Sequence, residues 1–175
     1  MSATETLAAR IPEAARDLRL NLQAVLRDGT LTPTQRWGVA IASAIASRSP
    51  ALRDALVADA AAADVPAAVV EDATAAAAIM GMNNVYYRFR HLVGLPGYEQ
   101  QRVGLRMNRL VKPASSRADF ELFALAVSAI NACETCIRGH EKALRDQGIT
   151  EEQVNDAVRI AAVVHGTAVA LQMPE

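Results

Sequence analysis

The chain has 175 residues, of which 51% are hydrophobic, but it contains only one Trp, three Tyr and three Phe. This composition favours closely packed helices over a β-sheet, and the length allows one domain that buries its own core without disulfides. The 18 basic and 19 acidic residues are spread along the chain and leave a net charge of −1, so we expect neither nucleic acid nor an anionic membrane as a partner.

Helix signals follow one another along the whole chain. Pro12 can open a helix that runs to Gly29, and Thr32, Pro33 and Gln35 stand at the N-cap, N1 and N3 positions of the next. Turns are predicted at 94–100 and 111–113. The remaining helices are expected to start at Pro50 and Pro66 and to span about Arg117 to Ile130, Cys133 to Gln147 and Glu151 to Leu171. No segment alternates with a period of two for long enough to predict a strand, so the predicted fold class is all-α.

The cellular compartment is predicted from what the chain lacks. The N-terminal segment MSATETLAARIPEAARDLRL is charged throughout and has no apolar signal region. No apolar stretch reaches the roughly 18 residues that cross a bilayer. We therefore expect a soluble cytoplasmic protein, and in a reducing compartment a cysteine pair is more often catalytic or metal-binding than a permanent disulfide.

A weak internal repeat suggests two related halves. Residues 43–45 and 128–130 both read Ser-Ala-Ile when the chain is shifted by 85 residues, and a one-residue adjustment aligns 65–79 with 149–163. The prediction is a single domain over 1–175 with two pseudo-repeated helical halves, a degenerate one at about 32–95 and a catalytic one at about 115–171. In the first half, the positions of Cys133, Cys136 and His140 are predicted to be held by Arg48, Ala51 and Ala55.

The stretch NACETCIRGHE at 131–141 contains the only two cysteines. Asn131 and Glu134 are expected as N-cap and N3, which would place Cys133 in the first turn and Cys136 in the second. A helix N-terminus favours anions, and thiols there generally have a lowered pKa, so both cysteines are expected to be reactive. At 100° per residue, Cys133, Cys136 and His140 share one apolar side of this helix.

Two further residues could move protons at this site. His140, one turn after Cys136, is expected to reach its sulfur directly or through a water. Glu121 lies in the apolar run ADFELFALAVSAI, where an inward carboxylate needs a partner. A contact between Glu121 and His140 would complete a proton relay.

The cysteine pair could form one of three kinds of site. Zinc needs four ligands, whereas Cys133, Cys136 and His140 supply three at an unusual spacing, so no metal site is predicted. A structural disulfide that closes so short a loop would restrict the unfolded chain very little. Redox exchange needs an attacking thiolate, a second sulfur and a proton donor, and all three are present. The residues therefore favour a redox site.

The same residues carry a resemblance to a known family. The spacing Glu-X11-Cys-X2-Cys-X3-His, the upstream AAAIMGMNNVYYRFRHL and LRMN, and the opening RDLRLNLQAVL closely resemble the alkyl hydroperoxide reductase D (AhpD) family of the carboxymuconolactone decarboxylase-like superfamily. The resemblance covers essentially the whole chain. It implies an AhpD-like helical fold with two pseudo-repeated halves, a homotrimer, and no tightly bound cofactor.

The resemblance also implies an activity and roles for four residues. The activity is an antioxidant peroxidase that reduces alkyl hydroperoxides and regenerates the peroxiredoxin AhpC. Electrons come from a lipoyl group on a partner acyltransferase, which dihydrolipoamide dehydrogenase reduces. Carried over by position, Cys136 is the peroxidatic thiol that forms sulfenic acid, and Cys133 is the proton donor and resolving thiol that closes the Cys133–Cys136 disulfide. His140 and Glu121 form the proton relay, while Thr135 stands where some members have a second histidine.

Several alternatives stay open at this stage. Dipole arguments alone favour Cys133 as the attacking thiol, whereas the resemblance indicates Cys136. A non-redox carboxymuconolactone decarboxylase-type enzyme and a redox-sensing assembly module are the rival functions. His91 and His165 are expected to be structural. Packing or subunit contacts are expected for Met80, Met82, Asn83, Asn84, Tyr86 and Tyr87.

Overall fold

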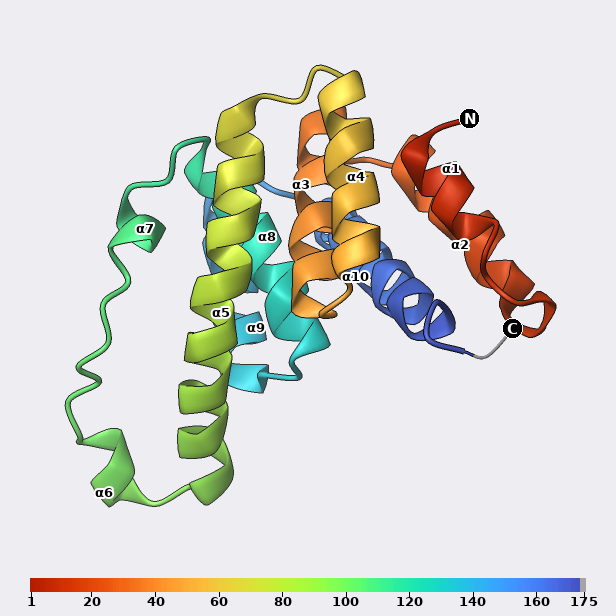
Figure 1. Ribbon diagram of the computed structural model, residues 1–175. Helices are drawn as coiled ribbons and strands as arrows, with labels where there is room; N and C mark the ends of the chain where they lie inside the picture. The colour runs from red at the N-terminus through yellow and green to blue at the C-terminus, as the bar shows by residue number, and fades with distance from the viewer. Residues whose placement is uncertain (174–175) are drawn as a thin grey trace.

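The computed structural model describes residues 1–173, and in that range it contains helices and no strand, which confirms the all-α prediction (Figure 1). None of the helices in this range is both long enough and apolar enough to cross a membrane. The elements are α1 (Ala3–Ala8), the 3₁₀ turn η1 (Glu13–Ala15), α2 (Arg16–Arg27), α3 (Pro33–Ala46), α4 (Pro50–Ala62), α5 (Ala67–Val93), α6 (Pro96–Glu99), α7 (Asn108–Val111), α8 (Arg117–Ile130), α9 (Glu134–Asp146) and α10 (Glu151–Ala170).

Helices α3 and α8 form the centre of the molecule. Every residue from Phe120 to Ser128 in α8 is buried, and so is every residue from Gly38 to Ala44 in α3. A helix that is covered on all sides must be surrounded by other helices, here mainly α5 and α10. Helices α1 and α2 lie at one side of the molecule, against α4 and α10, and the segment with α6 and α7 arches away from α5 on the other side (Figure 1).

The helix ends follow the predicted signals in most places. Thr32 and Thr150 each form a capping box with the Gln three residues later. The segment after Pro12 differs, because η1 comes first and α2 begins only at Arg16. Helix α1 was not predicted, although Ser2 and Glu5 form a capping box that the sequence contains. The predicted turn at 94–100 includes the single-turn helix α6.

Two three-helix units follow the same plan along the chain. The starts of α3, α4 and α5, at residues 33, 50 and 67, lie 84 residues before those of α8, α9 and α10, at 117, 134 and 151. The turns agree as well, since Arg48 and Ala132 both adopt a left-handed backbone, with φ of 55° and 52°. A duplication of the unit stays a prediction, which this parallel supports.

The register of this parallel corrects the sequence comparison by one residue. The Ser49 amide donates to the Ala44 carbonyl, as the Cys133 amide donates to the Ser128 carbonyl, so Ser49 occupies the place of Cys133. Leu52 and Leu56 then correspond to Cys136 and His140. The predicted counterparts Arg48, Ala51 and Ala55 are therefore wrong, because matching letters in alanine-rich helices do not determine the register.

Two buried aspartates join the units to each other. Asp72 of α5 accepts hydrogen bonds from the amides of Ala114 (3.1 Å) and Ser115 (2.6 Å), just before α8. Asp156 of α10 accepts from the amide (2.7 Å) and hydroxyl (2.8 Å) of Thr30, just before α3. The last helix of each unit thus fixes the entrance to the first helix of the other.

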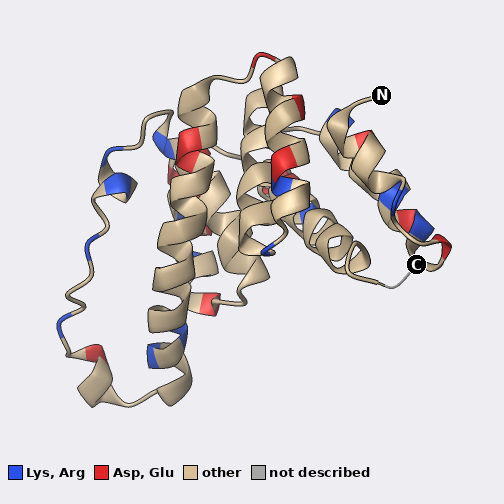
Figure 2. Ribbon diagram, in the orientation of Figure 1, with Lys and Arg blue, Asp and Glu red and all other residues tan. Residues whose placement is uncertain are grey.

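Charges are mixed over most of the surface. Acidic and basic residues are both scattered over the helices (Figure 2), which agrees with the nearly neutral chain. The segment between α6 and α7 and the end of α7 are more basic, with Arg102, Arg106, Arg109 and Lys112. Arg109 is paired with Glu71 and Asp72 of α5, so part of this charge is neutralised within the molecule.

Candidate active site

The turn between α8 and α9 sets the position of both cysteines. Asn131 ends α8 as its C-cap, Ala132 turns the chain with its left-handed backbone, and α9 begins at Glu134 with Cys133 as N-cap. The expected Asn131–Glu134 cap is therefore wrong, because the left-handed residue separates Asn131 from α9. Cys136 is at N3 of α9, so both sulfurs lie by the positive end of the helix dipole.

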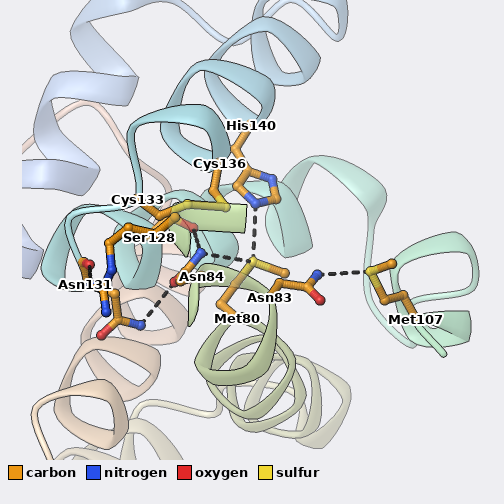
Figure 3. Close-up of a disulfide and its surroundings, with 10 residues drawn as sticks. Met80, Asn83, Asn84, Met107, Ser128, Asn131, Cys133, Cys136 and His140 are labelled. Atoms are coloured by element: carbon orange, nitrogen blue, oxygen red, sulfur yellow. Dashed lines mark hydrogen bonds between the residues drawn. A yellow bond between two sulfur atoms is a disulfide. The ribbon is translucent and has the colours of Figure 1, made fainter. Parts of the chain in front are cut away.

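Cys133 and Cys136 form a disulfide, with 5.3 Å between their Cα atoms (Figure 3). Their exposure differs strongly. Cys133 is 0% exposed, whereas Cys136 is partly exposed. A molecule arriving from solvent therefore meets the sulfur of Cys136 first. Among residues 1–173, no three His, Cys, Asp or Glu side chains gather as a metal site would need.

Glu121 and His140 lie in contact, as the sequence predicted. Glu121 is in the first turns of α8, His140 is in the second turn of α9, and the two helices pack together. His140 Nδ1 is 2.6 Å from Glu121 Oε2, and the two side chains are only 13% and 11% exposed. A short contact between two nearly buried ionisable groups indicates a shared proton or an ion pair. Their function as a relay stays a prediction.

The other ring nitrogen of His140 faces a residue that sequence reasoning did not assign to the site. His140 Nε2 is 3.2 Å from the sulfur of Met80, a residue of α5 that is 1% exposed (Figure 3). In the described part of the chain, the ring makes no hydrogen bond to either cysteine sulfur. His140 was expected to reach the Cys136 sulfur directly or through a water; this disulfide form has no direct hydrogen bond, and the water-mediated contact stays a prediction.

The chain is similar in sequence to a known protein family and to several named relatives. Residues 96–173 match the carboxymuconolactone decarboxylase family. A protein named alkyl hydroperoxide reductase AhpD from Anaeromyxobacter dehalogenans (strain 2CP-C) is 62% identical over 173 residues, which are 99% of this chain and 92% of the relative. AhpD proteins of Brucella suis and Solibacter usitatus are 48% and 47% identical, over 96% and 97% of this chain and 95% of each relative. The chain belongs to the AhpD family. This membership confirms the resemblance that the cysteine motif and its context had indicated.

A buried amide network holds the cysteine turn of this AhpD-family protein. The Asn84 side chain donates to the Ser128 hydroxyl (2.9 Å) and accepts from the Asn131 side chain (2.9 Å). Arg88, one turn further along α5, donates to the Asn131 carbonyl. Packing or subunit contacts were predicted for Asn84, and its side-chain partners Ser128 and Asn131 lie within the chain.

The other two histidines of the AhpD fold make polar contacts outside the cysteine pair and the Glu121–His140 pair. His91 Nε2 is 3.2 Å from Glu134, and His165 Nδ1 is 3.1 Å from the Ser47 hydroxyl. The pKa of Glu134 is lowered by its hydrogen bond with Arg138, and also by His91. Neither histidine touches the cysteines, Glu121 or His140, which agrees with the structural roles expected for them.

Proposed function

We propose that this protein is an alkyl hydroperoxide reductase in which Cys133 and Cys136 alternate between dithiol and disulfide. One observation carries the proposal: the disulfide lies at the N-terminus of α9, next to the Glu121–His140 pair, in a chain of the AhpD family. These parts supply a reactive thiol, a second sulfur and a proton donor. The relatives' name, alkyl hydroperoxide reductase, gives the substrate class.

The difference in exposure supports Cys136 as the thiol that attacks the peroxide. Its thiolate attacks the terminal oxygen of ROOH, the O–O bond breaks, and RO⁻ takes a proton from the His140–Glu121 pair to leave as ROH. Cys136 is then a sulfenic acid. The Cys133 thiol attacks this sulfur, and water leaves with the Cys133 proton and the sulfenic hydroxyl. The products are ROH, water and the Cys133–Cys136 disulfide.

The disulfide has to be reduced before another cycle. A dithiol donor would attack Cys136, the accessible sulfur, and a second attack on the mixed disulfide would release the donor as its own cyclic disulfide. We propose the lipoyl group of an acyltransferase, reduced by dihydrolipoamide dehydrogenase, as this donor. We further propose the peroxiredoxin AhpC as a partner and the cytoplasm as the compartment, both on the family resemblance.

An exposed apolar face supports the proposed homotrimer. Met82, Val85, Phe89 and Leu92 follow one side of α5 at helical spacing and are 37%, 61%, 48% and 75% exposed. Phe89 packs edge to face on Tyr98 of the following segment, with ring centroids 5.4 Å apart. Contiguous exposed apolar surface of this kind is typical of interfaces. Light scattering should give three times the chain mass, and Val85→Glu should lower the mass of the assembly.

The activity is tested with cumene hydroperoxide and dihydrolipoamide. Wild type should oxidise dihydrolipoamide continuously, while Cys136→Ser and Cys133→Ser should not. In a single turnover, dimedone should label Cys133→Ser at Cys136 and leave Cys136→Ser unlabelled. His140→Gln should slow the peroxide step by about a hundredfold, the lower range for acid–base catalysis. His165→Gln, a histidine outside the site, serves as the matched control.

The result that would end the proposal is sustained turnover in Cys136→Ser. A redox sensor would form the disulfide and change its assembly without repeated peroxide turnover. A non-redox decarboxylase would keep its activity when both cysteines are replaced.

A further inference from the structure

The His140 ring in the disulfide form lies between two groups of different chemistry. Nδ1 faces Glu121 Oε2 at 2.6 Å, and Nε2 faces the Met80 sulfur at 3.2 Å. A thioether has no hydrogen to donate, so the contact with Met80 is a hydrogen bond only if Nε2 carries a proton. Met80 is 1% exposed, and α5 holds it there as part of the core, so its sulfur is an acceptor shielded from solvent.

The two contacts of His140 determine how many protons the His140–Glu121 pair holds. With a proton on Nε2, the short Nδ1–Oε2 contact needs one more proton, either on the ring as imidazolium or on Glu121 as a carboxylic acid. Both forms contain one proton more than a neutral imidazole beside a carboxylate. If Nε2 had no acceptor in front of it, the ring could place its single proton on Nδ1, toward Glu121. The pair would then be a base instead of an acid.

We infer that Met80 is a positioning residue that holds the His140–Glu121 pair in its proton-loaded form while Cys133 and Cys136 are joined. The inference rests on the proposed function, because it assigns the loaded proton to the reduction of this disulfide. Met80 acts through His140 and does not itself touch a reacting atom.

The extra proton of the His140–Glu121 pair is used when the disulfide is reduced. The first donor thiol gives its proton to solvent, its thiolate attacks Cys136, the disulfide breaks, and Cys133 leaves with the electron pair and takes the proton of the second donor thiol. A second donor thiolate then attacks the donor sulfur of the mixed disulfide, and Cys136 leaves as a thiolate. A thiolate is a stronger acceptor than a thioether, so the Nε2 proton moves from its position at Met80 to Cys136. A proton from solvent reloads His140, the donor becomes a disulfide and the protein a dithiol.

The position of the proton on the His140 ring can be measured without running the reaction. Ring nitrogen-15 NMR of the oxidised wild type should show that His140 Nε2 is protonated. In Met80→Leu, which keeps the side-chain volume in a core position, Nε2 should appear unprotonated. Met107→Leu is the matched control, because the Met107 sulfur accepts an amide hydrogen of Asn83 at 3.0 Å in the same region but does not touch His140. A wild-type spectrum with unprotonated Nε2, or a Met80→Leu spectrum identical to wild type, would overturn the inference.

The rate of disulfide reduction is measured with dithiothreitol, a small dithiol that needs no partner protein. Met80→Leu should slow reduction of the disulfide by about tenfold or more, since acid catalysis is lost, while Met107→Leu should stay within about twofold of wild type. Equal slowing in both variants would show a packing role and overturn the inference. If wild type fails to turn over hydroperoxide with dihydrolipoamide, the proposed function fails, yet the NMR result still decides whether Met80 holds the Nε2 proton.

Discussion

Replacing Asp72 by Asn should weaken the connection that leads into the helix of Glu121. The Asp72 side chain is fully buried and accepts four hydrogen bonds, from the amides of Ala114 and Ser115, the Ser115 hydroxyl (2.7 Å) and Arg109 Nε (2.8 Å). Asn keeps one acceptor oxygen but turns an NH₂ group toward the two Ser115 donors. Each charge-assisted bond contributes roughly 1.5–3 kcal/mol, and the hydroxyl can rotate to accept, so we expect a loss of about 3 kcal/mol in the free energy of unfolding.

The effect should depend on pH with a definite sign. Burial by itself would raise the pKa of the Asp72 carboxyl, but the hydrogen bonds from Ser115, Ala114 and Arg109 outweigh it and lower the pKa below its usual value. A carboxyl with a lowered pKa in the folded state stabilises above the unfolded pKa of about 4, and this contribution is lost as the pH falls through the folded value. The gap between wild type and Asp72→Asn should therefore shrink below about pH 4.

Urea unfolding followed by circular dichroism at pH 7, 4 and 3 measures this gap. Glu71→Gln is the control, because Glu71 pairs with the same Arg109 at 2.7 Å but is 63% exposed, so its loss should cost at most about 1 kcal/mol. Equal destabilisation of the two variants, or a gap for Asp72→Asn that does not change with pH, would refute the reasoning.

Two further pairs of variants test packing near the site. A methyl group on Gly38 would lie 2.2 Å from the ring of Phe123, so Gly38→Ala should destabilise by about 1–3 kcal/mol. A methyl group on Gly81 would meet no atom within 4 Å apart from its chain neighbours and the nearby backbone of its own helix, so Gly81→Ala should stabilise by about 0.5–1 kcal/mol. Thermal unfolding of both variants checks the opposite signs. Asn84→Ala should cost about 2 kcal/mol because it leaves buried amide and hydroxyl partners unsatisfied. Asn83→Ala should cost less, since within residues 1–173 its oxygen has no partner, and equal losses in urea unfolding would contradict this difference.

The local signals in the sequence predicted helices and their ends well. Capping boxes at Thr32 and Thr150 depend on residues three apart, so the sequence contains all the information needed. The start of the cysteine helix was predicted wrongly, because nothing local marks Ala132 as left-handed. That error moved Cys133 and Cys136 along the helix and did not change which residues were expected to react.

The sequence alone predicted those parts of the site that lie on two neighbouring helices. The spacing of Glu121, Cys133, Cys136 and His140 predicted a redox pair with an acidic partner for the histidine, and α8 and α9 bring these residues together as adjacent elements. Only the tertiary structure decided that Cys133 is covered while Cys136 is open, and that Met80 faces His140. Met80 comes from a helix 60 residues away, and its sequence context is that of any core methionine, because a contact between distant helices depends on how they pack and leaves no periodic signal in the chain.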